Sequence, residues 1–90
     1  MRLKINRNRL NGALFCDFAL DGQEYHASLC EMLYDDYETE CMIFKARGGR
    51  VTDWGGEYCE RGIPVTEESL RECVMNFIDL KKQENGNKEN

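Results

Sequence analysis

Two dipeptides that favour tight β-turns, Asn11-Gly12 and Asp21-Gly22, lie close together near the start of the chain. A two-residue hairpin turn needs a positive φ at both central residues, which Asn, Asp and Gly adopt most readily. Asp35-Asp36 and Gly48-Gly49 are two further candidates for such turns. Four turns at this spacing predict an antiparallel meander, in which each strand pairs with the next one along the chain.

Each turn also determines which residues face each other across the paired strands. The first turn pairs Ile5 with Phe18, and the second pairs Phe18 with Tyr25. The third turn pairs Ala27 with Phe44. These registers collect apolar side chains on one face, whereas a slip by one residue would turn a strand's side chains to the other face. The residues predicted to face this core are Leu3, Ile5, Leu14, Cys16, Phe18, Leu20, Tyr25, Ala27, Leu29, Met42, Phe44 and Ala46.

A helix is predicted over residues 66–82. Thr66 can cap its start, and Glu67 and Glu68 suit the positive end of a helix dipole. Apolar residues then recur at helical spacing and form one stripe, namely Leu70, Cys73, Val74, Phe77 and Leu80. The predicted fold is therefore α+β, an antiparallel β-meander of four to five strands with one C-terminal helix packed on one face.

The chain of 90 residues is long enough for one small domain, which we place at residues 1–82. Residues 51–54 form the candidate fifth strand, and residues 55–62 are expected to be a loop. Residues 83–90 contain no apolar side chain and are expected to form a disordered tail.

The opposite face of the predicted sheet also carries apolar residues. Across Gly48-Gly49, Trp54 would face Ile43, which lies in one row with Phe15. Exposed apolar patches of this kind mark partner surfaces, for another protein or for a second copy of the chain. The alternative is that the 55–62 loop folds back and covers the patch with its tyrosine. The candidate partner-binding residues are Phe15, Ile43, Trp54, Leu10 and Tyr58.

Acidic residues crowd the third turn and form a predicted acidic pole, consisting of Glu31, Asp35, Asp36, Glu38 and Glu40. The whole chain has 12 Lys and Arg against 17 Asp and Glu, a net charge of −5. This balance disfavours nonspecific binding to nucleic acid or to an anionic membrane. The acidic pole is either a solvated loop or a surface that imitates nucleic-acid phosphates for a basic protein partner.

Asp17 and His26 are predicted to face each other across two strands, with Ser28 nearby on the same face. They form either a cross-strand ion pair or the centre of a small ligand-binding or catalytic domain. Cys30 and Cys41 are also predicted to lie opposite each other. The five cysteines lack CxxC or zinc-site spacing, so we expect reduced thiols and no metal or cofactor.

The segment of residues 61–68, with the sequence RGIPVTEE, resembles the strand-to-helix entry of the PC4-like single-stranded nucleic-acid-binding proteins. Members of that family also have a meander followed by one helix. The resemblance implies single-strand binding on the open sheet face as an alternative function. The basic and aromatic residues that the family uses there are not matched in this chain, so no site residue is carried over.

The sequence thus favours a small acidic, non-enzymatic protein-binding module without catalytic residues. No signal peptide and no apolar run of membrane-spanning length are present, so the expected location is the cytoplasm. Size and charge suit an accessory protein of a phage or mobile element that inhibits or modulates a host factor.

Overall fold

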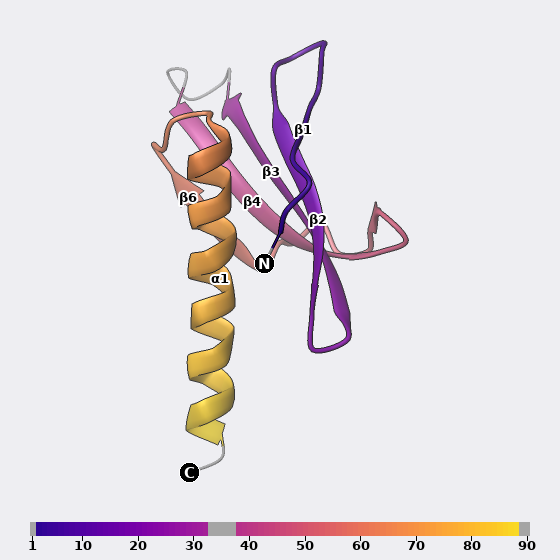
Figure 1. The fold of residues 1–90 in the computed structure, drawn as a ribbon, viewed down its shortest axis with the longest axis vertical. Helices are drawn as coiled ribbons and strands as arrows, with labels where there is room; N and C mark the ends of the chain where they lie inside the picture. The colour runs from indigo at the N-terminus through magenta and orange to yellow at the C-terminus, as the bar shows by residue number, and fades with distance from the viewer. Residues whose placement is uncertain (1, 33–37, 89–90) are drawn as a thin grey trace.

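The computed structural model describes residues 2–32 and 38–88, and side chains as far as residue 84. An antiparallel sheet is covered on one face by a C-terminal helix, so the predicted α+β class is confirmed (Figure 1). The strands lie in the order β1-β2-β3-β4-β5, and a further strand, β6, also pairs with β4. The elements are β1 (Asn6–Arg7), β2 (Leu14–Leu20), β3 (Gln23–Met32), β4 (Glu38–Arg47), β5 (Arg50–Val51), β6 (Tyr58–Arg61) and α1 (Glu67–Lys88).

The β2–β3 hairpin has the predicted register. Its turn residues Asp21 and Gly22 have φ values of 51° and 82°, as this turn type requires. Phe18 therefore pairs with Tyr25, and their rings stack at a centroid distance of 5.3 Å. This hairpin places the largest aromatic side chains of β2 and β3 on one face.

The β1–β2 connection is longer than predicted. Arg7 pairs with Leu14, so residues 8–13 form the loop in place of a two-residue turn at Asn11-Gly12. Asn8 closes this loop, because its backbone N–H donates to the Ala13 carbonyl and its side-chain oxygen accepts from the Leu10 N–H. The register shifts by two residues, and such a shift keeps every side chain on its predicted face.

The predicted register of β3 and β4 is wrong by one residue. Ala27 pairs with Ile43 rather than with Phe44, and Leu29 pairs with Cys41. The last pair joins Met32 and Glu38, so five residues connect the strands, and the turn predicted at Asp35-Asp36 lies outside the described residues.

Because the observed register differs from the predicted one by one residue, the two faces of β4 are exchanged relative to the prediction. Ile43 and Cys41 lie in the core below α1, whereas Met42, Phe44 and Ala46 lie on the opposite face. The segment of residues 41–44 is apolar at every position, so the alternation of polar and apolar residues could not choose between the two registers.

The chain after β4 forms two short strands on the same edge. Gly48 and Gly49 make the predicted turn, with φ values of 58° and 80°, and Arg47 pairs with Arg50. The chain then leaves the sheet after Thr52 and returns at Glu57, whose N–H donates to the Ile43 carbonyl.

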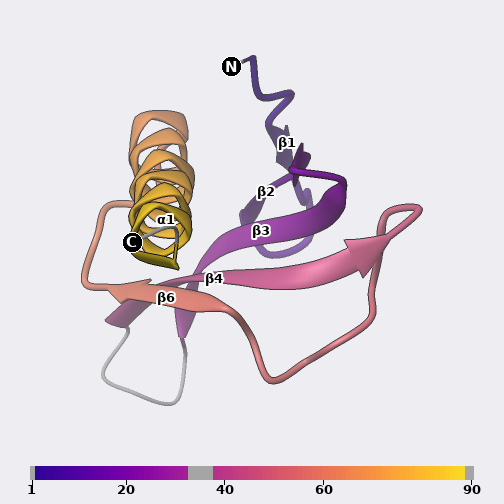
Figure 2. The ribbon, with the colours of Figure 1, turned by 90° about the horizontal axis from the view of Figure 1, so that it is seen from below.

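Residues 58–61, predicted to be part of a loop, form β6. Ile43 therefore pairs with Tyr58, and the predicted pairing of Ile43 with Trp54 is wrong. Figure 2 shows α1 end-on at one side of the sheet and the segment that joins the β4–β5 hairpin to β6 reaching toward the other side.

Helix α1 begins as predicted. Thr66 caps it, because its Oγ1 accepts a hydrogen bond from the Ser69 N–H at 3.1 Å. The Phe77 ring lies at the centre of the core, with its centroid 4.9 Å from that of Tyr25 and 6.1 Å from that of Phe18. The buried side chains of the helix are Leu70, Cys73, Val74, Phe77 and Ile78.

The helix continues to Lys88, beyond the predicted end at residue 82. Leu80, predicted to be in the apolar stripe, is exposed, and Ile78 is buried in its place. Gln83 and Glu84 are exposed, so helical geometry continues there without burial. The division into a domain at 1–82 and a disordered tail at 83–90 stays a prediction. Among the described residues, no helix combines the length and the apolar character needed to cross a membrane.

Candidate protein-binding surface

The face of the sheet that α1 leaves uncovered, called the open face below, carries alternate residues of the paired strands. Its rows follow from the observed registers, which place Phe15 beside Ser28 and Met42, and His26 beside Phe44. Its strand residues are Asn6 of β1, Phe15, Asp17 and Ala19 of β2, Glu24, His26, Ser28, Cys30 and Met32 of β3, Glu38, Glu40, Met42, Phe44 and Ala46 of β4, Val51 of β5, and Cys59 and Arg61 of β6.

Trp54 stands above this face on the loop between β5 and β6. Its ring lies edge-on to Phe44, with centroids 5.3 Å apart and planes at 61°. Trp54 remains 75% exposed, whereas Phe44 beneath it is only 9% exposed. The loop therefore covers one aromatic side chain of the open face and presents another to solvent.

The loop approaches the sheet closely at Gly56. The φ of this residue is +80°, and a Cβ there would lie 2.7 Å from the Cε of Met42. Glycine satisfies both constraints, because it has no Cβ and adopts positive φ readily. A hydrogen bond from the Gly55 N–H to Asp53 Oδ1, at 2.9 Å, closes the turn that carries Trp54. The position of Trp54 is thus defined by local backbone geometry as well as by Phe44.

Two of the five predicted partner-binding residues lie elsewhere. Ile43 is fully buried against α1, because the slip of β4 turns it to the core. Tyr58 pairs with Ile43 on the helix side, and its ring lies 5.8 Å from that of Phe77. Hence Tyr58 does not cover the open face, and the partial cover observed comes from Trp54 and Gly56.

The other three predicted residues are accessible, to different degrees. Phe15 lies half-buried on the open face, 6.0 Å from the His26 ring. Leu10 is 97% exposed at the tip of the β1–β2 loop. Sequence reasoning missed Met42 and Phe44 as open-face residues, because it assigned both to the core.

The acidic pole is only partly described. Glu40 binds Arg61 through a 2.9 Å contact between Oε2 and Nε. Glu31 and Glu38 are exposed on neighbouring strands, and Glu31 lies on the opposite face from Glu38. The positions of Asp35 and Asp36 lie outside the described residues.

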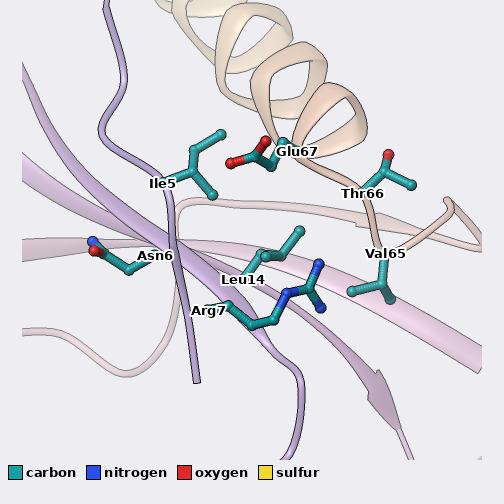
Figure 3. A pocket seen from close by; sticks show the side chains of 7 residues that line it. All are labelled: Ile5, Asn6, Arg7, Leu14, Val65, Thr66 and Glu67. Carbon is teal, nitrogen blue, oxygen red and sulfur yellow. The ribbon is translucent and has the colours of Figure 1, made fainter. Parts of the chain in front are cut away.

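Asp17 and His26 form the predicted pair. Their side chains meet at 2.9 Å between Oδ1 and Nδ1, and the His26 side chain is 22% exposed. A cavity of about 440 Å³ lies elsewhere, between β1 and the start of α1 (Figure 3). It is lined by Ile5, Asn6, Arg7, Leu14, Val65, Thr66 and Glu67.

The five cysteines, all among the described residues, are free thiols. Cys30 pairs with Glu40, not with Cys41 as predicted, because of the slip of β4. Burial raises the pKa of Cys16 to about 11. A hydrogen bond with Cys41, together with burial, raises the pKa of Cys73. The described residues hold no group of three or more His, Cys, Asp or Glu side chains arranged to bind a metal ion.

Burial and a hydrogen bond to Glu60 raise the pKa of the Tyr58 hydroxyl to about 12. That hydroxyl donates to Glu60 Oε2 at 2.8 Å, and Asn76 of α1 donates to the same oxygen. These two hydrogen bonds link β6 to the helix, while the pairing of Tyr58 with Ile43 places its side chain on the core side.

Comparison with models of protein families, with curated proteins and with solved structures finds no match to this chain.

Proposed function

We propose that this chain is a non-enzymatic protein-binding module that presents its open face, with Trp54 as the anchor, to a partner protein. The observation that carries the proposal is the 75% exposure of Trp54 on a loop held against Phe44. Tryptophan is enriched among the few residues that dominate binding energy in protein interfaces. A ring that is exposed before binding and held in place loses little freedom when a partner covers it.

The surroundings of Trp54 suit such an anchor. Phe15 and Met42 are half-buried on the same face, so they add apolar contact area beside it. Three exposed acidic residues of the same face, Asp17, Glu24 and Glu38, supply polar groups for a rim, as in many protein interfaces. The small size and net charge of −5 suit an accessory protein of a phage or mobile element that inhibits or modulates a host factor.

Affinity capture from native cytosol, read out by mass spectrometry, tests the proposal. Three baits are compared, namely the wild-type chain, Trp54→Ala and the control Met75→Ala, which truncates a 41% exposed side chain on α1. We expect a protein that the wild type and the control both retain and that Trp54→Ala loses. Equal capture by all three baits would exclude Trp54 as the anchor. Capture of nucleic acid in place of protein would favour the single-strand-binding alternative.

A further inference from the structure

The strands of this sheet sort their charges between the two faces. On the side of α1 the basic strand residues are Arg7, Lys45, Arg47 and Arg50, and the acidic ones are Glu31 and Glu60. On the open face the acidic strand residues are Asp17, Glu24, Glu38 and Glu40, and the one charged basic residue among the described strand positions is Arg61. The open face is thus much more acidic than the helix side of the same sheet.

The positive charge of Arg61 offsets the negative charge of Glu40 and little else on the open face. Its guanidinium contacts Glu40 at 2.9 Å, so the two side chains neutralise each other. Asp17 is hydrogen-bonded to His26 yet keeps 55% of its side chain exposed. Glu24 and Glu38 are exposed as well. Asp53, next to Trp54 on the loop, is also exposed.

The acidic residues bracket the apolar centre along the strand direction. Glu24 lies opposite Ala46 and Glu38 starts β4, so the two positions are eight residues apart on one strand. At about 3.3 Å per residue this separation is about 26 Å. Phe44 and Met42 lie between these two ends. A ligand that satisfies this face needs an apolar stripe flanked by positive charge over that length.

From these observations we infer that the open face binds a basic amphipathic helix of the partner, about 17 residues long at 1.5 Å per residue. The inference rests on the proposed function and adds the chemistry of the partner. A helix is the element that covers a sheet face with one apolar side, and α1 already covers the other face in this way. Lysine or arginine residues beside its apolar stripe would lie against the carboxylates, while the stripe itself packs on Trp54 and on the half-buried Phe15 and Met42.

The same charge pattern argues against two other occupants. In a second copy, α1 is itself acidic in its first turn, with Glu67 and Glu68, and the open face would repel the like face of that copy. A single-stranded nucleic acid would bring phosphates against the same carboxylates. Both occupants are therefore outcomes that would overturn the inference.

The experiment uses the emission of Trp54, which is the sole tryptophan of the chain. The probe is a synthetic 18-residue Leu/Lys peptide with an amphipathic helical pattern and no tryptophan, and its matched control is the Leu/Glu peptide of the same pattern. We expect the Leu/Lys peptide to change the emission of Trp54 saturably, and to bind more weakly as salt is added. No binding, equal binding of the Leu/Glu peptide, or a change of emission with protein concentration alone would overturn the inference. Binding of an oligothymidine in place of the Leu/Lys peptide would do the same.

A pair of double variants separates the open face from the net charge of the chain. Glu24→Gln with Glu38→Gln removes two charges from the open face, and Glu72→Gln with Asp79→Asn removes two from exposed positions of α1. We expect the first pair to weaken binding of the Leu/Lys peptide about fivefold and the second pair by less than about twofold. Equal weakening by both pairs would mean that net charge alone attracts the peptide.

These outcomes are separate from the capture experiment on Trp54. If Trp54→Ala loses a native partner but the Leu/Lys peptide does not bind, the proposed function stands and the partner's chemistry is wrong. If the peptide binds but all three baits capture the same proteins, the face is acidic and apolar without the proposed biological role.

Discussion

Replacing Ile43 by alanine tests the register of β4, because Ile43 and Met42 lie on opposite faces in the predicted and in the observed register. Ile43 is fully buried against α1, whereas Met42 is half-buried on the open face. Truncating a buried Ile or Met to Ala destabilises a protein by about 2–5 kcal/mol, from lost apolar burial and from the cavity that remains. We expect a loss of about 3–4 kcal/mol for Ile43→Ala. For Met42→Ala we expect about 1–2 kcal/mol, because part of that side chain already contacts water.

Urea denaturation followed by circular dichroism measures both losses. Total stabilities of natural domains are about 5–15 kcal/mol, so Ile43→Ala removes a large share but leaves a folded state that can be measured. In a domain of this size 1 kcal/mol corresponds to roughly 4–8 °C in Tm, so the Tm of the Ile43→Ala variant would fall by roughly 12–32 °C. Met42→Ala serves as the matched control, being the adjacent residue with a side chain of similar size. Equal losses, or a larger loss for Met42→Ala, would refute the register in which Ile43 faces the helix.

Further predictions concern the loop, the helix start and the thiols. Trp54→Ala should change the free energy of unfolding by less than about 1 kcal/mol in urea denaturation, because the ring is mostly exposed, and a large loss would place it in the core. Thr66→Ala should destabilise the fold by about 1 kcal/mol through loss of the cap, which hydrogen exchange in the first turn of α1 would report. The free energy of unfolding should fall between about pH 9 and 11. The pKa of the Cys16 thiol is 9.0 in the unfolded chain and about 11 in the folded protein, so the thiol ionises first in the unfolded chain. The loss assigned to this residue is about 3 kcal/mol, and urea midpoints of Cys16→Ala should show a shallower decline across that range. A thiol reagent at pH 8 should label exposed Cys59 first and half-buried Cys30 more slowly, and rapid labelling of Cys16 in the native protein would contradict its burial.

The parts of the fold that were predictable depend on contacts close in sequence. The Asp21-Gly22 turn determines its own hairpin, since the positive φ values and the alternating residues beside them act within one short segment. The start of α1 is equally local, because Thr66 binds the N–H three residues along. Both were read correctly from the residues themselves.

The register of β4 was not predictable in this way. Residues 41–44 place an apolar side chain on each face in either register, so the pattern of apolar residues along β4 favours neither register. The choice depends on residues far away in sequence, where Cys41 and Ile43 meet α1 and where Phe44 meets Trp54. The strand β6 was missed for a related reason, since the tyrosine that begins it pairs with Ile43 and packs on Phe77 of the helix.

In the candidate surface, too, the residues whose positions depend on distant contacts were the ones predicted wrongly. Phe15, Trp54 and Leu10 are accessible. Phe15 lies on the correctly predicted β2–β3 hairpin, whereas Leu10 and Trp54 lie on loops in place of the predicted strand positions. Ile43 and Tyr58 were assigned to the wrong side, and Phe44 and Met42 were missed, because all four depend on the face that β4 turns outward.

Sequence alone determined the class of the fold, the β2–β3 hairpin, the start of the helix and the acidic charge of the chain. Tertiary structure decided which face of β4 meets the helix, and with it where the charges lie. The slip moves Lys45 to the helix side and turns Glu38 and Glu40 to the open face. The reason is physical, since side chains alternate along a strand and one residue of register exchanges every one of them. The neighbours that select the register are joined only when the chain is folded.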